Sequence, residues 1–215
     1  MVDSIVFGNP TQNQLRWLEK EGIGYKFFDQ LSKFNFPKNS SRATREELNE
    51  LVDFVAETLK DEEAIKRYRQ YDYNLIGVYS RHIKDMQLTE EDKISILMND
   101  ILLDVNHLVY NLKYFFQRPR PYQLAKFYNL SLFPLKSINA DSPSYPSLQI
   151  VQADILSYVL GNWFPAHYDF FDRLSLDVQD SRVKSGLNYA SDLDFSMFVS
   201  ELIKTDKEFL AKYSL

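Results

Sequence analysis

The sequence predicts an all-α fold that forms a single domain over residues 1–215. Three observations support this prediction. Apolar residues recur three and four positions apart along most of the chain, helix-capping and helix-stopping residues flank these stretches, and no stretch alternates apolar and polar residues as a half-buried strand does. A chain of 215 residues with 45% hydrophobic residues can bury one sizeable core. We therefore expect one helical bundle.

The first 80 residues are predicted to contain short elements followed by two longer helices. Residues 1–40 combine glycines, prolines and scattered aromatic residues, which indicates short helices and turns. An amphipathic helix is expected over 45–60, with Thr44 as its N-cap and a glutamate three residues later. A second helix is expected from Glu62 to Ser80, with an apolar stripe that is rich in tyrosine.

A long helix is expected in the middle of the chain. Thr89 is a suitable N-cap, and apolar residues keep the helical period over 94–116 until Pro119 stops it. Lys113 lies in the last turns, so this helix should deliver it to a fixed point in the interior. The proline-rich residues 119–148 are expected to form a loop that crosses the end of the bundle.

The C-terminal third is predicted to be helical throughout. Expected helices cover about 148–163, beginning at Ser147 or Pro146, and then 166–178, 181–200 and 203–213.

Composition excludes several classes of function. A net charge of −5 and a pI near 5.3 argue against general affinity for nucleic acid or anionic membranes, so any basic site must be a local pocket. The absence of cysteine excludes disulfides, thiolate metal sites and cysteine nucleophiles. The longest apolar tract, 94–112, is too polar to span a membrane, and the N-terminus lacks the features of a secretory signal. A cytoplasmic protein is expected.

Three segments carry the residues on which a functional prediction can be built. They are a lysine followed after six residues by Arg-Pro (Lys113, Arg120, Pro121), the run SYPSLQ (144–149), and a Ser-Arg pair followed by an asparagine and an aspartate (Ser181, Arg182, Asn188, Asp192). Their order and spacing resemble K-x6-R-P, P-S-G-H and S-R-x5-H-x3-D. These are the motifs shared by type-2 phosphatidate phosphatases, class A bacterial acid phosphatases and vanadium haloperoxidases. The resemblance covers about 113–195.

The resemblance implies a helical bundle of the acid phosphatase/haloperoxidase type with a phosphate-binding site. Lys113, Arg120 and Arg182 would bind the phosphoryl oxygens, since a spread anionic charge needs converging donors and arginine forks suit it well. Main-chain N–H groups around Ser147 and Leu148, near a helix start, would add further donors. The expected ligand is phosphate or a small phosphoester. No cofactor or metal is expected, because no cluster has metal-ligand spacing.

Both histidines of the family motifs are replaced. Gln149 stands where the family has the residue that protonates the leaving group, and Asn188 stands where it has the nucleophile. Asp192 keeps the orienting position and, four residues after Asn188, can accept its N–H. A carboxamide does not titrate near neutral pH and is a poor nucleophile, so turnover by the family route should be absent or nearly so. Leu148 replaces the family glycine, which puts the loop shape in question if a positive φ is needed there.

Two alternatives to an inactive phosphate-binding protein stay open at this point. One is an active phosphomonoesterase that uses a displaced residue such as His167. The other is a non-catalytic scaffold or interaction protein, for which a homo-oligomer formed through exposed aromatic residues would fit. His82 is expected at the surface and His107 in a packing role, while Arg118 and Lys184 are expected to face solvent.

Overall fold

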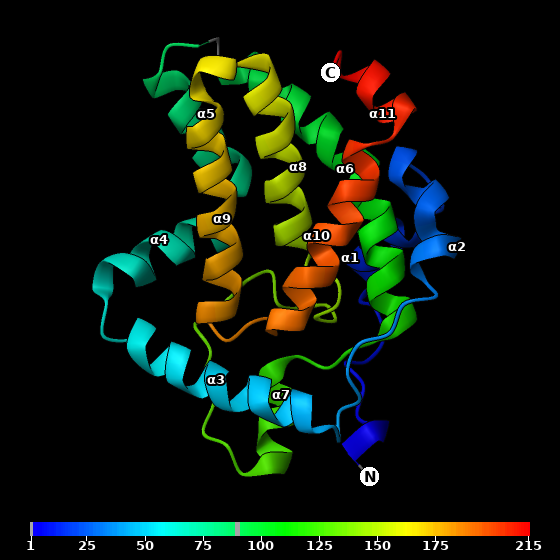
Figure 1. The fold of residues 1–215 in the computed structure, drawn as a ribbon, viewed down its shortest axis with the longest axis vertical. Coiled ribbons are helices and arrows are strands. Elements are labelled where there is room, and N and C mark those ends of the chain that lie inside the picture. The colour runs from blue at the N-terminus through cyan, green and yellow to red at the C-terminus, as the bar shows by residue number, and fades with distance from the viewer. Residues whose placement is uncertain (1, 89–90) are drawn as a thin grey trace.

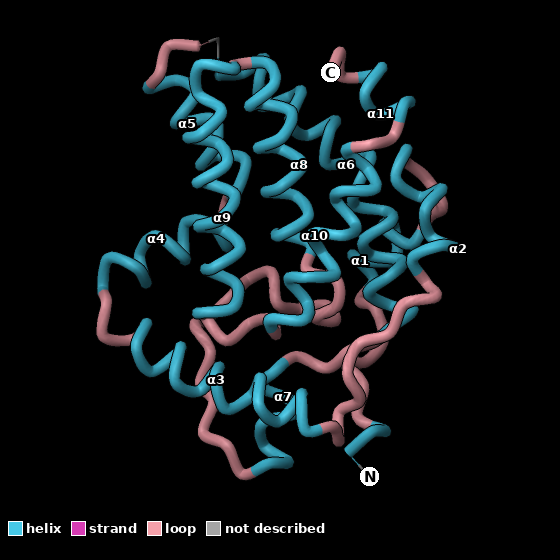
Figure 2. Tube along the Cα trace, in the orientation of Figure 1, coloured by secondary structure: helices cyan, strands magenta, loops and turns pink. Residues whose placement is uncertain are grey.

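The computed structural model describes residues 2–88 and 91–215, and every regular element in them is a helix (Figure 2). The α-helices are α1 (Gln12–Leu15), α2 (Phe28–Leu31), α3 (Arg42–Thr58), α4 (Glu62–Tyr73), α5 (Leu75–Asp85), α6 (Glu91–Phe116), α7 (Pro121–Ala125), α8 (Leu148–Trp163), α9 (Tyr168–Lys184), α10 (Ala190–Lys204) and α11 (Lys207–Lys212). Short 3-10 helices cover Val2–Ser4, Arg16–Leu18, Ile23–Phe27, Lys126–Tyr128 and Pro165–His167. The all-α prediction is confirmed.

Helix α8 is the centre of the bundle. It packs against α9, α10 and α6 (Figure 1), and most of its side chains are buried, including Ile150, Val151, Ile155 and Val159. A helix that is apolar on all sides needs neighbours around it, which explains its position. The start of α8, the last turn of α9 and the first turn of α10 consequently lie at one end of the bundle.

A second, smaller core closes this end. Helix α3 runs across it (Figure 1), and Leu48, Leu51 and Val55 of α3 pack with Leu124 of α7 and with Tyr189 just before α10.

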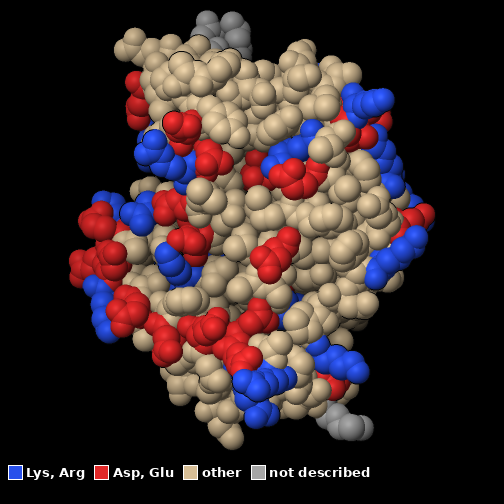
Figure 3. Space-filling view, in the orientation of Figure 1, with Lys and Arg blue, Asp and Glu red and all other residues tan. Residues whose placement is uncertain are grey.

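On the face seen in Figure 3, acidic side chains gather over α3 and basic ones are interspersed, without a broad basic surface on that face. Of the helices that the structure describes, none combines the length and the apolar character needed to cross a bilayer.

The expected cap at Thr44 is wrong by one turn. Helix α3 begins at Arg42, and its N-cap is Ser41, whose hydroxyl accepts a hydrogen bond from the Thr44 amide at 3.1 Å. The Thr44 hydroxyl donates instead to the carbonyl oxygen of Lys38 at 2.8 Å. Both residues are good caps in isolation, and the turn formed by 38–41 decides between them.

The helix expected from Glu62 to Ser80 is two helices. Helix α4 ends at Tyr73 and α5 begins at Leu75, because Asn74 leaves the helical conformation and its side chain accepts from the Gly77 amide at 2.9 Å. Apolar periodicity continues on both sides of the break and therefore hides it. The expected cap Thr89 lies outside the described residues.

The C-terminal helices agree with the prediction at α8 and differ after it. Helix α8 begins after the N-cap Ser147, as expected. Helix α9, however, continues through the break expected near 178–181 and ends at Lys184, where Gly186 has a φ of +71° and its N–H donates to Val183 O at 2.8 Å. A left-handed glycine is a common helix stop. Arg182 therefore lies in the last turn of α9.

Candidate functional site

The three motif segments meet at the end of the bundle that α3 closes. Lys113 comes from the last turn of α6, Arg120 from the segment after it, and Arg182 from the last turn of α9. Only 1%, 2% and 3% of their surfaces are exposed, respectively. Lys113 lies close enough to both arginines to interact with them electrostatically, and all three cations are buried in the interior. Their binding of a phosphoryl group stays a prediction.

Asn188 lies between the two arginines and faces them with its oxygen. Oδ1 accepts from Arg120 Nη1 at 3.2 Å, from Ser147 Oγ at 3.3 Å and from Arg182 Nε at 3.4 Å. Nδ2 donates to the carbonyl oxygen of Ser144 at 2.8 Å. Because the amide nitrogen must face this acceptor, the oxygen must point toward the cations.

Asp192 is fully buried in the first turn of α10. Its Oδ2 accepts from Asn188 Nδ2 at 3.1 Å and from the Tyr189 amide at 2.9 Å. The contact expected between Asn188 and Asp192 is present. A carboxylate in the first turn of a helix is stabilised by the N–H groups there, which offsets part of the cost of burying Asp192.

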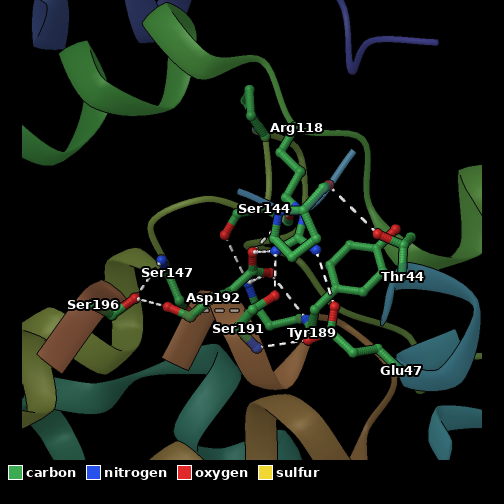
Figure 4. Close-up of polar contacts among 12 residues, drawn as sticks. Thr44, Glu47, Arg118, Ser144, Ser147, Tyr189, Ser191, Asp192 and Ser196 are labelled. Atoms are coloured by element: carbon green, nitrogen blue, oxygen red, sulfur yellow. Dashed lines mark hydrogen bonds and ion pairs between the residues drawn. The ribbon is translucent and has the colours of Figure 1, made fainter. Parts of the chain in front are cut away.

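Arg118 was expected to face solvent, and this expectation is wrong. Its side chain is 1% exposed, and Nη1 donates to Asp192 Oδ1 at 2.7 Å while Nη2 pairs with Glu47 Oε2 at 3.2 Å. Figure 4 shows the guanidinium reaching toward Asp192 and Glu47 over the ring of Tyr189, 3.9 Å from the ring centroid. Two carboxylates and an aromatic face compensate the burial of this charge.

Asp72 is part of the site although it lies outside the three motif segments. It lies in the last turn of α4, and its Oδ1 accepts from Arg182 Nη1 at 2.7 Å and from Ser137 Oγ at 2.5 Å. Its Oδ2 accepts from the Ile138 amide at 2.8 Å. The available signal was an aspartate within a helical stripe of buried tyrosines, which requires a partner when it is buried.

Lys113 and Arg120 have no carboxylate partner in the described part of the chain. Lys113 Nζ donates to the carbonyl oxygen of Pro143, and Arg120 donates to the carbonyl oxygens of Ser142 at 2.8 Å and Leu187 at 2.9 Å. Burial, with Arg120 nearby, holds the pKa of Lys113 well below its usual range. Burial, with Arg182 nearby, lowers the pKa of Arg120 to about 10.

The start of α8 contributes less to this cluster than expected. The Ser147 amide, one of the proposed main-chain donors, is already bonded to Ser196 Oγ at 2.8 Å. Leu148 is the first residue of α8 and does not have a positive φ. A leucine at the position of the family glycine therefore causes no backbone strain. Gln149 bonds to α4: its Nε2 donates to the carbonyl oxygens of Tyr71 at 3.2 Å and Asp72 at 3.3 Å.

The histidines lie away from the cluster. His167 follows α8 at its far end, roughly 24 Å along the helix from Leu148 at about 1.5 Å per residue, so His167 cannot act as the displaced catalytic residue. His107 packs its ring edge-on against Trp17, as expected. His82, expected at the surface, is half-buried and packs against Phe170. Among the side chains that the structure describes, those of residues 2–88 and 94–215, no three His, Cys, Asp or Glu residues are grouped to hold a metal ion.

Comparison with protein-family models and with curated protein sequences gives no match. The side-chain geometry and the spacing of the motifs are therefore the observations from which function is inferred.

Proposed function

We propose that this chain binds phosphate or a small phosphoester at the cluster of Lys113, Arg120 and Arg182, and that it does not hydrolyse phosphoesters by the route of the family it resembles. The proposal includes a bundle of the acid phosphatase/haloperoxidase type. The observation that carries it is the buried excess of positive charge: Lys113 and Arg120 are almost completely buried, and neither pairs with a carboxylate in the described residues.

Uncompensated buried charge is costly, so its presence needs a reason. A buried charge that lacks a partner usually loses it or gains a counter-ion. A phosphoryl group would supply several anionic oxygens to donors from three segments and would raise the pKa of Lys113 back toward its usual range. An anion bound at these donors would therefore offset the burial that lowers the pKa values of Lys113 and Arg120.

The hydrogen bonds from the two arginines to Asn188 are long enough that an anion could replace Asn188 as their acceptor. The arginines approach its Oδ1 at 3.2 and 3.4 Å, which is longer than the roughly 2.7–2.9 Å of charge-assisted hydrogen bonds. A charged phosphoryl oxygen would bind the same donors more strongly than a neutral amide oxygen does. Asn188 would then give up long contacts, while Asp192 continues to hold its nitrogen.

The same residues argue against hydrolysis. Asn188 offers an amide oxygen in place of a nucleophilic nitrogen, and Gln149 uses its N–H groups on the main chain of α4. Neither side chain can carry a proton to a leaving group near neutral pH. Binding without turnover follows from these substitutions.

A scaffold function is the second candidate, and one observation favours it. Protein oxygens from Asn188 and Asp72 already accept hydrogen bonds from the arginines of the cluster, so the cluster can also be read as a structural network. The two candidates differ in whether an added oxyanion binds.

Isothermal titration calorimetry with inorganic phosphate distinguishes them. We expect the wild type to bind phosphate with a dissociation constant below about 1 mM, equivalent to about −4 kcal/mol. Arg120→Gln should weaken binding by at least about tenfold. Lys66→Met, which removes an exposed lysine on α4, is the matched control and should bind as the wild type does. Failure of the wild type to bind phosphate, sulfate or tungstate would sink the proposal in favour of the scaffold.

A further inference from the structure

A cavity of about 390 Å³ lies beside the cation cluster, where the turn between α4 and α5 meets α6 and the start of α8. It shares Asp72 and Gln149 with the site described above. Its size falls within the range of roughly 300–1,000 Å³ that is common for small-ligand sites. Carboxamides dominate its polar lining: Asn74, Asn99, Asn106, Asn139, Gln149 and Gln152. We call it the amide-lined cavity.

Gln149 lines this cavity and carries one buried polar atom that lacks a partner among the described residues. Only 6% of the residue is exposed, and its Oε1 is buried without a hydrogen-bond partner in the described residues. The orientation of the amide is fixed by its donors, because Nε2 must face the carbonyl oxygens of Tyr71 and Asp72 to which it donates. Buried polar atoms almost always have a partner. A hydrogen-bond partner for Oε1 would have to donate an O–H or an N–H, because an amide oxygen only accepts.

Two further carboxamides offer a mixture of donors and acceptors. Gln152 Nε2 donates to Asn106 Oδ1 at 2.9 Å, which leaves Gln152 Oε1 as an acceptor and Asn106 Nδ2 as a donor, both without a partner in the described part of the chain. Hydroxyl groups suit such a set, because each can donate and accept. An acyl chain would leave these amides unpaired, and an anionic group would find no lysine or arginine among the described lining residues and would meet Asp72.

Asp72 connects the cavity to the cation cluster. Its carboxylate binds Arg182 at 2.7 Å, while its main-chain oxygen accepts from Gln149 at 3.3 Å. An ester with its phosphate at Arg182 would therefore have its alcohol part beside Gln149. The aromatic rings of Trp17 and Tyr110, stacked 5.9 Å apart, also line the cavity and offer apolar surface to the C–H groups of such a ligand.

We propose that the amide-lined cavity holds the neutral, polyhydroxylated part of the phosphoester, so that the preferred ligand is a sugar phosphate or polyol phosphate. This inference rests on the proposed function, since the phosphate itself would lie at the cation cluster.

Sorbitol 6-phosphate and hexyl phosphate are a matched pair of probes, because they share a six-carbon chain and a phosphate and differ in the hydroxyl groups. In calorimetric titrations we expect sorbitol 6-phosphate to bind at least about tenfold more tightly than hexyl phosphate or inorganic phosphate, which corresponds to about 1.4 kcal/mol. Asn106→Ala and Gln152→Ala should each reduce this preference severalfold and leave the affinity for inorganic phosphate unchanged. Asn162→Ala is the control, since Asn162 is an exposed carboxamide on α8 that bonds only to Tyr158 O in its own helix.

The outcomes separate this inference from the function on which it rests. If inorganic phosphate binds and sorbitol 6-phosphate binds no more tightly than hexyl phosphate, the inference is overturned and the proposed function stands. A preference that survives both alanine substitutions places the hydroxyl groups elsewhere and also overturns it. If no phosphate compound binds, the proposed function fails and this inference fails with it. Circular dichroism identifies a variant that does not fold, in which case the other alanine variant decides.

Discussion

Asn188 donates a hydrogen bond from Nδ2 to Asp192 Oδ2 at 3.1 Å, and this bond turns the amide oxygen toward Arg120 and Arg182. An imidazole at position 188 could use one ring nitrogen in the same way and present the other to the cations. Asp192 is itself held by Arg118 at 2.7 Å. The framework that would orient a nucleophile is therefore present, whereas the titratable group is not.

Introducing histidines at positions 149 and 188 should produce phosphoester hydrolysis. We expect wild type to release negligible p-nitrophenol from p-nitrophenyl phosphate, and Gln149→His with Asn188→His to exceed it by at least about 10²-fold, since a nucleophile and a general acid each contribute on the order of 10²-fold or more. Because Leu148 has no positive φ, adding Leu148→Gly should give no further gain.

The control for this experiment is the same double variant with Asp192→Asn, which should lose most of the restored activity because the imidazole is no longer oriented by a carboxylate. Hydrolysis by the wild type at the rate of the double variant would contradict the proposal that Asn188 and Gln149 make the chain inactive.

The buried ammonium of Lys113 should lower the free energy of unfolding of the protein when no anion is bound. Its pKa is lowered by burial, so between this lowered pKa and the usual value of about 10.4 the unfolded chain binds more protons than the folded protein does. The stability of the wild type should therefore rise with pH as pH approaches that value from below.

Lys113→Met removes this dependence and should be as stable as the wild type or more stable, by about 1 kcal/mol at pH 7. Urea unfolding at pH 7 and pH 9 measures both effects. Phosphate should stabilise the wild type and not the variant. If Lys113→Met lowers the free energy of unfolding by several kcal/mol, the buried ammonium is a structural necessity and not a binding group.

Asp72→Asn should reveal how much Arg182 depends on its carboxylate. Removing one partner of a buried ion pair leaves the other charge uncompensated, so we expect a loss of about 3 kcal/mol in the free energy of unfolding. Asp180→Asn, which breaks the exposed pair with Lys184, should change stability by less than about 1 kcal/mol.

Phosphate should restore part of the stability of Asp72→Asn, because a phosphoryl oxygen can replace the missing carboxylate at Arg182. Differential scanning calorimetry with and without phosphate tests this. An equal upward shift of the melting temperature in the variant and the wild type would argue that phosphate does not reach Arg182.

Gly186 sets the turn that separates Arg182 from Asn188. Its φ is +71°, and a Cβ there would lie 2.7 Å from Val55 Cγ2, so Gly186→Ala should destabilise the protein by more than about 1 kcal/mol. Gly8 also has a positive φ, but a Cβ there would have no atom within 4 Å, so Gly8→Ala should show the conformational cost alone. Equal losses in the two variants would indicate that packing against α3 does not constrain the turn.

Local patterns in the sequence were sufficient for the helical class and for several site positions. The apolar period of α6 predicted a buried last turn for Lys113, α8 begins after Ser147 as expected, and the spacing from Asn188 to Asp192 predicted their contact. Each of these depends on residues within one helix or one turn, where periodicity and capping act directly.

The tertiary structure decided the partners of the charged residues. Nothing near Arg118 in the chain indicates that Glu47 and Asp192 will surround it, and Asp72 reaches Arg182 only because α4 packs beside α9. The break at Asn74 and the end of α9 at Gly186 were also hidden, since apolar periodicity does not register a single capping side chain or one left-handed residue. Helices follow from contacts between neighbours in sequence, whereas the charge balance of a buried cluster depends on segments that meet only after folding.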